Sequence, residues 1–409
     1  MINLYIIGNK ALRSSAYGIG TYINQLELSI QGSGMNVCFI HLNAETQRFS
    51  QKVENGVRHW YIPYPKNKYK EEEKHNKLYL QNAVFILRQY IQQTDNLIFH
   101  LNYPKYPTFA NALKASFNCK IVVAVHFFSW GFDIFGNVSR LQKILGKPEK
   151  KLDQLGKQVK ITFNEEKNLL CFVDKVLSLS NHNAKILQKI YQVNRQNISI
   201  IHNGLEDKAP KEFDRELIRR MYNLSVETPV VIFAGRLDPV KGLSYLIRAS
   251  KIVLDHFPDC HIVIAGSGDY DTYMKERGNR WMNIHFTGLL EKTELYELYS
   301  IADIGVMPSL YEPFGYVAVE MMMHCLPVIA TITSGLDEVV DKTCGFKVPV
   351  SVQSDRVEID TDFMAEKILY LLRNPVEARQ MGANGRKRYL KYFSSEIFYS
   401  KMLHLYKTL

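Results

Sequence analysis

Short apolar runs rich in Val, Ile, Leu and Phe alternate with longer stretches in which apolar residues recur every three or four positions. Apolar runs of four to eight residues are typical of strands buried on both faces, and the longer spacing predicts helices. The predicted strands are residues 3–7, 35–40, 96–101, 120–125, 175–180, 229–235, 260–266, 283–288, 302–309 and 326–330. The clearest predicted helices are residues 21–30, 78–93, 243–257 and 314–325. This alternation indicates an α/β fold with parallel sheets.

The alternation runs through the chain twice, and a polar segment over residues 205–228 separates the two series. A length of 409 residues is enough for two or three domains with separate cores. We therefore predict two doubly wound domains, residues 1–204 and 205–392, that face each other across a cleft. Ligands of such folds bind where parallel strands end at their carboxyl edge, so we look for the chemistry in those loops.

Composition narrows the class of protein only slightly. With 46% hydrophobic and 22% charged residues the chain is typical of globular proteins, and its longest apolar region, residues 317–332, is interrupted by Glu320, His324 and Pro327. The N-terminal apolar run is too short for a signal peptide, so we expect a cytoplasmic protein without a membrane span. The six cysteines lack C-x-x-C spacing, which favours buried free thiols over zinc ligands or a redox pair.

The net charge of +10 is unevenly distributed along the chain. Residues 1–204 hold 26 Lys and Arg against 13 Asp and Glu, whereas residues 205–409 hold 25 against 28. This excess suits an acidic partner such as anionic lipid or a phosphate-bearing acceptor, and it is also compatible with a merely solubilising surface. The basic segment from Arg140 to Lys160 is either a membrane-surface contact or a solvated helix. Nucleic acid is disfavoured because no recognition motif accompanies the charge.

Two glycines, Gly18 and Gly20, follow the first predicted strand and precede the first predicted helix. Glycines at such a turn let backbone amides approach a phosphate closely. The third glycine of the dinucleotide fingerprint is replaced by Ile23, and the second strand ends at His41 instead of an acidic ribose-binding residue. A nicotinamide dehydrogenase is therefore disfavoured.

A second motif, "AGRLDPVKG", places Arg236 and Lys241 in a turn directly after an apolar strand. Two cations held at the carboxyl end of a strand, with glycines on either side, suit a small ligand with two negative charges. We interpret this turn as a diphosphate site.

A third motif, "SLYEPFGYVAVEMMMHC", places Glu312 and Glu320 eight residues apart around a Pro-Phe-Gly turn. Pro313 favours a helix start, which predicts that the backbone amides of residues 314–316 are free to bind hydroxyls or phosphate oxygens. A carboxylate can accept two hydrogen bonds from neighbouring hydroxyls, so Glu320 suits a ribose and Glu312 a sugar. Taken singly, each glutamate could instead be a helix cap or an ion-pair partner.

The three motifs together resemble the retaining GT-B glycosyltransferases of family 4. The resemblance covers nearly the whole chain, because residues 178–187, 200–207 and 285–304 also stand where that family has similar segments. It implies two Rossmann-like domains and a last helix, residues 393–409, that crosses back onto the first domain. It also implies a nucleoside-diphosphate sugar as donor substrate, linked to UDP or GDP, and no further cofactor.

The resemblance implies a role for each motif residue. Arg236 and Lys241 would bind the donor diphosphate, and Glu320 would bind the nucleotide ribose. The donor sugar would contact Glu312 and the amides of Phe314, Gly315 and Tyr316. The backbone around Gly288 and Leu290 would hold the base, while the early glycines correspond to Gly18-Ile19-Gly20.

A histidine that closes a strand of the N-terminal domain faces the donor sugar in that family. Here "KIVVAVHFFSW" presents His126 at that place, after five apolar strand residues. The family's usual aspartate neighbour is absent, and Phe127 stands in its position. We expect His126 to position the donor sugar. The aromatic residues that follow could stack on a sugar or an aglycone, or belong to the core.

The expected chemistry is hexosyl transfer with retention. The acceptor hydroxyl attacks from the face that the diphosphate leaves, and Arg236 and Lys241 stabilise the leaving charge, so no metal is required. Two acidic triplets, residues 269–271 and 360–362, precede helical segments, and we interpret their first aspartates as N-caps instead of metal ligands.

Several alternatives remain open from the sequence. The first is a nucleotide-sugar 2-epimerase of the same fold, which needs no acceptor. The second is a non-catalytic GT-B subunit that supports a partner enzyme. The acceptor itself could be a glycan, a lipid-linked sugar or a peptide, with peripheral contact at the inner face of the cell membrane.

Overall fold

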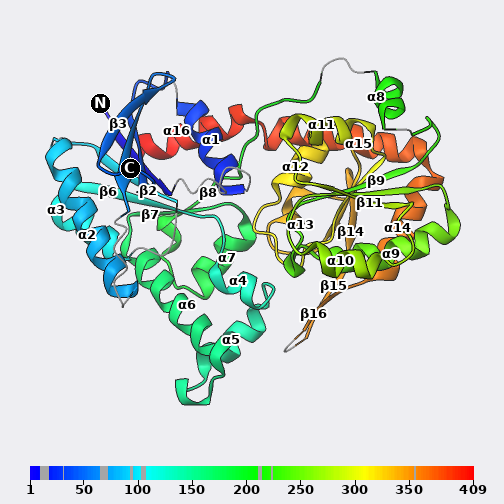
Figure 1. The fold of residues 1–409 in the computed structure, drawn as a ribbon. Helices are drawn as coiled ribbons and strands as arrows, with labels where there is room; N and C mark the ends of the chain where they lie inside the picture. The colour runs from blue at the N-terminus through cyan, green and yellow to red at the C-terminus, as the bar shows by residue number, and fades with distance from the viewer. Residues whose placement is uncertain are drawn as a thin grey trace. The chain divides into compact units, whose positions relative to one another are not determined.

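The computed structural model describes residues 1–9, 18–30, 32–64, 72–92, 95–102, 107–210, 214–222, 224–353 and 356–409. The chain divides into two compact units (Figure 1). Unit 1 comprises Met1–Ser129, Pro148–Gly204 and Ser395–Leu409, and unit 2 comprises Trp130–Lys147 and Leu205–Ser394. Each unit contains its own largely parallel sheet with helices, so the predicted α/β class is confirmed. The cleft that we expect between the two domains stays a prediction.

Unit 1 is built on an eight-stranded sheet with the strand order β3-β4-β2-β1-β5-β6-β7-β8. All neighbouring strands are parallel except β3, which pairs antiparallel with β4. The strands are β1 (Asn3–Asn9), β2 (Asn36–Ala44), β3 (Ser50–Glu54), β4 (Val57–Pro63), β5 (Leu97–Leu101), β6 (Cys119–Val125), β7 (Lys175–Ser178) and β8 (Ile198–Ile200). The five predicted strands of this half are present, whereas β3, β4 and β8 were not predicted.

The helices of unit 1 flank this sheet. They are α1 (Gly18–Ile30), α2 (Glu72–Tyr90), α3 (Pro107–Ser116), α6 (Gln154–Phe172), α7 (Asn181–Lys189) and the C-terminal helix α16 (Ser395–Lys407). Helix α16 packs beside α1, although almost the whole sequence separates them (Figure 1). The rings of Phe398 and Tyr22 meet edge to face in this contact, with their centroids 5.5 Å apart. The predicted return of the last helix to the first domain is therefore confirmed.

Unit 2 is built on a six-stranded parallel sheet with the order β11-β10-β9-β12-β13-β14. Its strands are β9 (Val230–Ala234), β10 (His261–Ala265), β11 (Ile284–Gly288), β12 (Ile304–Met307), β13 (Val328–Thr331) and β14 (Gly345–Val348). The chain builds outward from β9 to β11 and then returns to the other side of β9 with β12. In open α/β sheets ligands bind beyond the carboxyl ends of the strands at the point where the strand order reverses, which here lies between β9 and β12.

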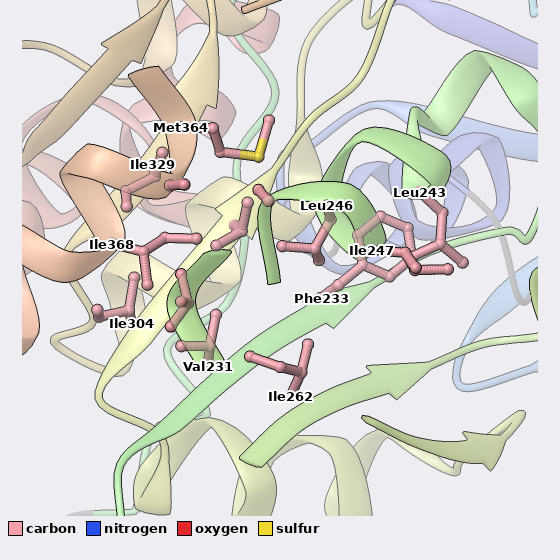
Figure 2. Packing of buried hydrophobic residues seen from close by; sticks show 14 of the residues in the cluster. Val231, Phe233, Leu243, Leu246, Ile247, Ile262, Ile304, Ile329, Met364 and Ile368 are labelled. Atoms are coloured by element: carbon pink, nitrogen blue, oxygen red, sulfur yellow. The ribbon is translucent and has the colours of Figure 1, made fainter. Parts of the chain in front are cut away.

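One face of this sheet carries the large apolar core of unit 2 (Figure 2). The cluster includes Ile262 and Ile304 of the sheet, Leu246 of α9 (Leu243–His256), and Met364 and Ile368 of α14 (Thr361–Arg373). These side chains are fully buried, and strands that are apolar over their whole length were the signal for them in the sequence.

The remaining elements of unit 2 include several that connect or cap the layers. They are α4 (Ser129–Asp133, which begins in unit 1), α5 (Val138–Gly146), α8 (Arg215–Met221), α10 (Tyr270–Arg277), α11 (Lys292–Ile301), α12 (Tyr316–Met323), α13 (Leu336–Val339) and α15 (Pro375–Tyr392), with a small antiparallel pair β15 (Val350–Val352) and β16 (Val357–Ile359). Short 3-10 turns at Glu149–Lys151, Arg195–Asn197 and Pro239–Lys241 complete the fold.

One segment groups differently from our expectation. Residues 130–147 lie within the predicted N-terminal domain, but their contacts place them in unit 2. The ring of Tyr311 lies against Gly131 and Gly136, where a Cβ atom would come within 2.2 and 2.9 Å of it. Asn137 also donates a hydrogen bond from Nδ2 to the carbonyl oxygen of Gln353, at 2.7 Å. Sequence periodicity could not predict this grouping because it depends on contacts between distant residues.

The six thiols are free, as predicted, but the expectation that all are buried is wrong for Cys171 and Cys325, which are exposed. Asp269 and Asp360 cap helices α10 and α14, as the acidic triplets predicted. In the described part of the chain, no group of three or more His, Cys, Asp or Glu side chains is placed to hold a metal ion. No described helix is both long and apolar enough to span a bilayer.

Candidate active site

The reversal of strand order in unit 2 brings two of the predicted motifs together. The loop after β9 carries Arg236 and Lys241, and the loop after the adjacent strand β12 carries Glu312. Nζ of Lys241 donates to Oε2 of Glu312 at 2.6 Å, and both side chains are mostly buried. The tertiary structure thus unites a cation and a carboxylate that are 71 residues apart in the sequence.

A glycine allows these two loops to approach each other. Gly242 has a φ of +67°, and a Cβ atom at this position would lie 1.8 Å from the carbonyl oxygen of Pro308. The amide of Leu310 donates to the carbonyl oxygen of Val240 at 2.7 Å and closes the same contact. Only glycine fits this conformation and this spacing, so the second glycine of "AGRLDPVKG" has a structural reason.

Asp238 holds the turn between the two cations. Its Oδ1 accepts from the amide of Lys241 at 3.2 Å as the N-cap of the 3-10 turn, and its Oδ2 contacts Arg236 Nη2 at 2.9 Å. The guanidinium of Arg236 also lies 5.6 Å from the ring centroid of Phe132. Sequence reasoning missed Asp238, although an aspartate directly before a proline at a turn start was a usable signal.

The Pro-Phe-Gly turn differs from the predicted geometry. Helix α12 begins at Tyr316, so our expectation that Pro313 starts the helix is wrong. Gly315 takes a left-handed φ of +103° directly before the helix, and Phe314 is buried. The amide of Gly335 donates to the carbonyl oxygen of Glu312 at 3.0 Å. The predicted amides of residues 314–316 therefore lie in a tight turn at the helix start and not within one continuous helical turn.

Glu320 lies deep in unit 2 on α12, with 1% of its surface exposed. Nζ of Lys292 donates a short hydrogen bond to Oε1, and the hydroxyl of Tyr299 donates to Oε2 at 3.4 Å. Burial, followed by the nearby charge of Glu320, raises the pKa of Tyr299 well above its usual value, so the phenol stays protonated and can donate. Both partners come from α11 with a spacing of seven residues, which places them on one helix face.

The predicted base-binding backbone lies at the carboxyl end of β11, two strands away from β9. Gly288 takes a left-handed φ of +83°, and its carbonyl oxygen accepts from the amide of Gly266 at 2.9 Å. Leu290 is half-buried just beyond this strand end. The position thus lies at the same carboxyl edge as Arg236 and Glu312.

In unit 1, His126 directly follows β6 and is 7% exposed. Its Nε2 is 3.1 Å from Oδ1 of Asn102, whose Nδ2 donates to the carbonyl oxygen of Ile7 at 3.1 Å. The imidazole packs edge to face on Tyr22, with the ring centroids 4.5 Å apart. Burial, and secondarily His100, lowers the pKa of His126 to about 3, so the ring is neutral near pH 7.

A second histidine, His100, lies close to Tyr22 in the same region of unit 1. His100 is fully buried, and its Nδ1 and Nε2 lie 2.8 Å from the hydroxyl of Tyr406 and 3.3 Å from that of Tyr22. Burial lowers its pKa to about 3 as well. Tyr406 belongs to α16, so the C-terminal helix contributes directly to the surroundings of the strand ends. Sequence reasoning missed Asn102, His100 and Tyr406, because their positions alone carry no motif.

The backbone after His126 is held by hydrogen bonds to a buried glutamate. The amide of Ser129 donates to Oε1 of the buried Glu166 at 3.0 Å, and the hydroxyl of Tyr191 donates a short hydrogen bond to Oε2. Phe128 stacks on Tyr191 at 5.0 Å and is fully buried, as is Trp130. Phe128 and Trp130 therefore belong to the core, which is one of the two alternatives that the sequence left open for the aromatic residues after His126.

The predicted glycines of unit 1 lie at the start of α1. Gly18 is the first residue of this helix and is exposed, and Gly20 is buried. The turn that joins them to β1 lies outside the described residues. In β1 itself, the carbonyl oxygen of Ile7 accepts the hydrogen bond from Asn102.

Comparison with known proteins relates both halves of the chain to glycosyltransferases. Residues 16–208 match the family Glycosyltransferase Family 4, and residues 214–388 match Glycosyl transferases group 1. Each half of the chain thus matches a glycosyltransferase family model, and the fold is that of GT-B proteins. It is similar to sucrose-phosphate synthase of Thermosynechococcus elongatus, with a TM-score of 0.77 and 22% identity over 100% of this chain and 99% of that chain. Anabaena HepE in complex with UDP gives a TM-score of 0.72 at 15% identity, covering 100% of both chains.

Curated relatives align mainly over part of this GT-B chain. An uncharacterized glycosyltransferase of Methanocaldococcus jannaschii is 33% identical over 41% of this chain and 44% of its own length. A GDP-mannose-dependent phosphatidylinositol monomannoside mannosyltransferase of Corynebacterium glutamicum is 30% identical over 47% of this chain and 50% of its own length. Alpha-maltose-1-phosphate synthase of Mycolicibacterium smegmatis is 25% identical over 71% of this chain and 80% of its own length. The alignments with the first two thus span about half of each relative.

Proposed function

We propose that the chain is a retaining glycosyltransferase that moves a hexose from a nucleoside-diphosphate sugar to an acceptor hydroxyl. The observation that carries this proposal is the meeting of Arg236, Lys241 and Glu312 at the strand reversal of unit 2. Crevices at such reversals are where open α/β sheets bind ligands. Two cations beside a carboxylate suit a ligand that combines a diphosphate with a hydroxyl-bearing sugar.

The mechanism follows from the charge that develops as the glycosidic bond breaks. The leaving diphosphate gains negative charge, and the sugar becomes partly cationic. Arg236 and Lys241 stabilise the leaving oxygens, and preorganised groups of this kind contribute about 3 kcal/mol each in a closed site. We infer that these two side chains take the role that a divalent metal has in other transferases. A leaving oxygen then accepts the proton of the attacking hydroxyl on the same face, which retains the anomeric configuration.

Each glutamate has a separate role in this proposal. Glu312 accepts hydrogen bonds from sugar hydroxyls, and its pairing with Lys241 keeps its carboxylate at the edge of the diphosphate site. Glu320 accepts from the ribose hydroxyls. Lys292 and Tyr299 neutralise and orient its buried carboxylate, because an ionised carboxylate without partners is costly to bury.

The acceptor proposal rests on the basic character of the first half of the sequence. A phosphate-bearing or lipid-linked glycan at the cytoplasmic face of the cell membrane complements this charge. The curated relatives include proteins named for a phosphatidylinositol mannoside and for capsular polysaccharide biosynthesis, which support a surface glycan or glycolipid as the class of product. A structure of HepE holds UDP-glucose, which supports a nucleotide sugar as the donor.

The decisive experiment incubates the protein with a panel of UDP- and GDP-linked hexoses, with and without candidate acceptors. We expect one donor to release its nucleoside diphosphate faster when an acceptor is present. Proton NMR of the product should show the same anomeric configuration as in the donor. Conversion of the free nucleotide sugar without an acceptor would indicate an epimerase instead, and loss of turnover in EDTA with recovery in magnesium would contradict the metal-free mechanism.

Two variants separate binding from chemistry. Replacing His126 or Glu312 by Ala should lower turnover far more than it lowers nucleotide affinity, because both groups contact the sugar and not the nucleotide. Turnover and nucleoside-diphosphate binding by calorimetry are the two measurements. Equal losses in both quantities would assign these residues to simple binding.

A further inference from the structure

We propose that Asn102 is a positioning residue that holds His126 in the tautomer with its proton on Nε2, leaving Nδ1 as a hydrogen-bond acceptor for a hydroxyl of the donor sugar. This inference rests on the proposed function, because it takes His126 to face the sugar. Asn102 directly follows the carboxyl end of β5, and no sequence motif includes it.

The orientation of the Asn102 amide is fixed by its neighbours. The carbonyl oxygen of Ile7 can only accept a hydrogen bond, so the Asn102 atom 3.1 Å from it must be the amide nitrogen Nδ2. The amide oxygen Oδ1 then necessarily points to His126, at 3.1 Å from Nε2. Asn102 is 1% exposed, so water does not compete for either contact.

The orientation of the amide decides the tautomer of the ring. Oδ1 of Asn102 can only accept, so Nε2 of His126 must carry a proton. A neutral imidazole has one N–H, and Nδ1 therefore keeps its lone pair. Among the described residues, the titratable groups that face the ring are Tyr22 from α1 and His100 from β5, and neither supplies a negative charge that would favour an imidazolium.

A neutral acceptor suits the place that the proposed function gives to His126. A sugar that becomes partly cationic would be destabilised by an imidazolium beside it, whereas the lone pair of Nδ1 is compatible with that charge. Among the described residues, Nδ1 of His126 has no hydrogen-bond partner of its own, so it remains available to a ligand. An amide behind the ring achieves this state, whereas a carboxylate there would raise the pKa of His126.

The test combines a direct view of the tautomer with turnover. In protein labelled with 15N-histidine, long-range proton–nitrogen correlation spectra at pH 7.5 distinguish Nε2–H from Nδ1–H, and His126→Gln assigns the signal. We expect the Nε2–H form in the parent protein. In Asn102→Leu we expect a mixture of tautomers, together with a 10- to 100-fold lower turnover and a nucleoside-diphosphate affinity within about twofold of the parent.

Two further variants control this experiment. Asn36→Leu removes a side-chain amide at the amino-terminal end of β2. This position lies at the end of the parallel strands opposite to His126, so the variant should change neither the His126 signal nor turnover. Asn102→Asp keeps an acceptor for Nε2–H, but it adds a charge and removes the donor to the carbonyl oxygen of Ile7. The variant should keep the proton on Nε2. Its carboxylate should raise the pKa of His126, so Nδ1 becomes protonated and turnover is lost as the pH falls. This variant also answers the question if Asn102→Leu does not fold.

Two outcomes would overturn the inference. One is an Nδ1–H signal for His126 in the parent protein, whatever the activity. The other is parent-like turnover in Asn102→Leu when His126→Ala is inactive. A parent protein without turnover on any donor would overturn the proposed function instead, and the tautomer measurement would still decide the role of Asn102.

Discussion

The two units present different chemistry at equivalent places. Both have parallel sheets with candidate residues at the carboxyl ends of central strands. Unit 2 places ionic side chains there, with Lys241 paired to Glu312 and Arg236 paired to Asp238. Unit 1 places neutral ones there, centred on His126 and Asn102. The two units thus share an architecture but differ in the charge of the residues at their strand ends, and the proposed function assigns a different part of the donor to each.

The degree of burial matches each kind of chemistry. Lys241 and Glu312 keep 20% and 13% of their side-chain surface exposed. In the proposed function, each of them can therefore replace its contact with the other by a contact with the donor. His100 is fully buried and His126 nearly so, and both are kept neutral by this burial. The side chains proposed to hold the departing diphosphate and the side chain proposed to contact the sugar thus differ in burial as well as in residue type.

The largest effect should come from removing the ionic half of the comparison. The double variant Arg236→Ala/Lys241→Ala should lower turnover by ~10³-fold or more, since each cation stabilises the leaving charge by about 3 kcal/mol. Release of the nucleoside diphosphate from the preferred donor measures this. Arg248→Ala, which removes a cation that packs on Tyr245 of the same unit, should leave the rate close to the parent value. A double variant with parent-like rate would refute the proposed role of unit 2.

The next effect concerns the buried carboxylate of unit 2. Glu320→Gln keeps the shape of the side chain but leaves Lys292 and Tyr299 without a charged acceptor. Nucleotide affinity should fall ~10- to 100-fold, because hydrogen bonds to charged groups contribute about 1.5–3 kcal/mol. Calorimetric titration with UDP and GDP measures the change. The exposed Glu297→Gln on α11 is the matched control, and an equal loss there would argue against a specific ribose contact.

The neutral half of the comparison predicts a loss of stability in acid. The pKa of His100 is about 3 in the folded chain and about 6.5 when unfolded, so below pH 6.5 the unfolded state binds more protons. Its contribution to stability is complete above pH 6.5 and falls as the pH drops toward 3, by about 1.4 kcal/mol for each pH unit. Urea unfolding at pH 7, 6 and 5 should show a shallower decline in His100→Gln than in the parent. Identical slopes would show that His100 is not buried in its neutral form.

The smallest effect should come from the C-terminal helix. Tyr406→Phe removes the hydrogen bond to Nδ1 of His100 and should lower the free energy of unfolding by about 1 kcal/mol. Turnover should stay within about threefold of the parent, because Tyr406 is behind His100 and does not contact the proposed ligand. Tyr399→Phe, a half-buried residue of the same helix, should change stability less. A larger loss in Tyr399→Phe would mean that the hydrogen bond to His100 is unimportant.

The predicted elements succeeded where local periodicity was strong. All ten predicted strands are present, and α9 extends over Leu243–His256 close to its predicted bounds. The strands β3 and β4 escaped prediction because charged and polar residues interrupt their apolar positions. Helix α12 was placed two residues too early because Gly315 adopts a left-handed conformation that a helical pattern does not reveal.

The candidate site was predictable only in part. The motifs that follow strand ends contain Arg236, Lys241, Glu312 and His126, and one of them continues into α12 with Glu320. The sequence was therefore sufficient to select these five candidates. Their partners were not predictable: the pairing of Glu320 with Lys292 and of His126 with Asn102 depends on which strands and helices become neighbours.

The sequence by itself determined the α/β class, the two series of strands and the residue types at their ends, because these depend on periodicity and on local turn chemistry. Only the tertiary structure decided that β12 returns beside β9, which pairs Lys241 with Glu312. The resemblance implied that the last helix returns to the first domain, but only the tertiary structure decided that α16 packs on α1 and brings Tyr406 to His100. Strand order and long-range packing are set by the burial of apolar surface over the whole chain. No short stretch of sequence contains that information.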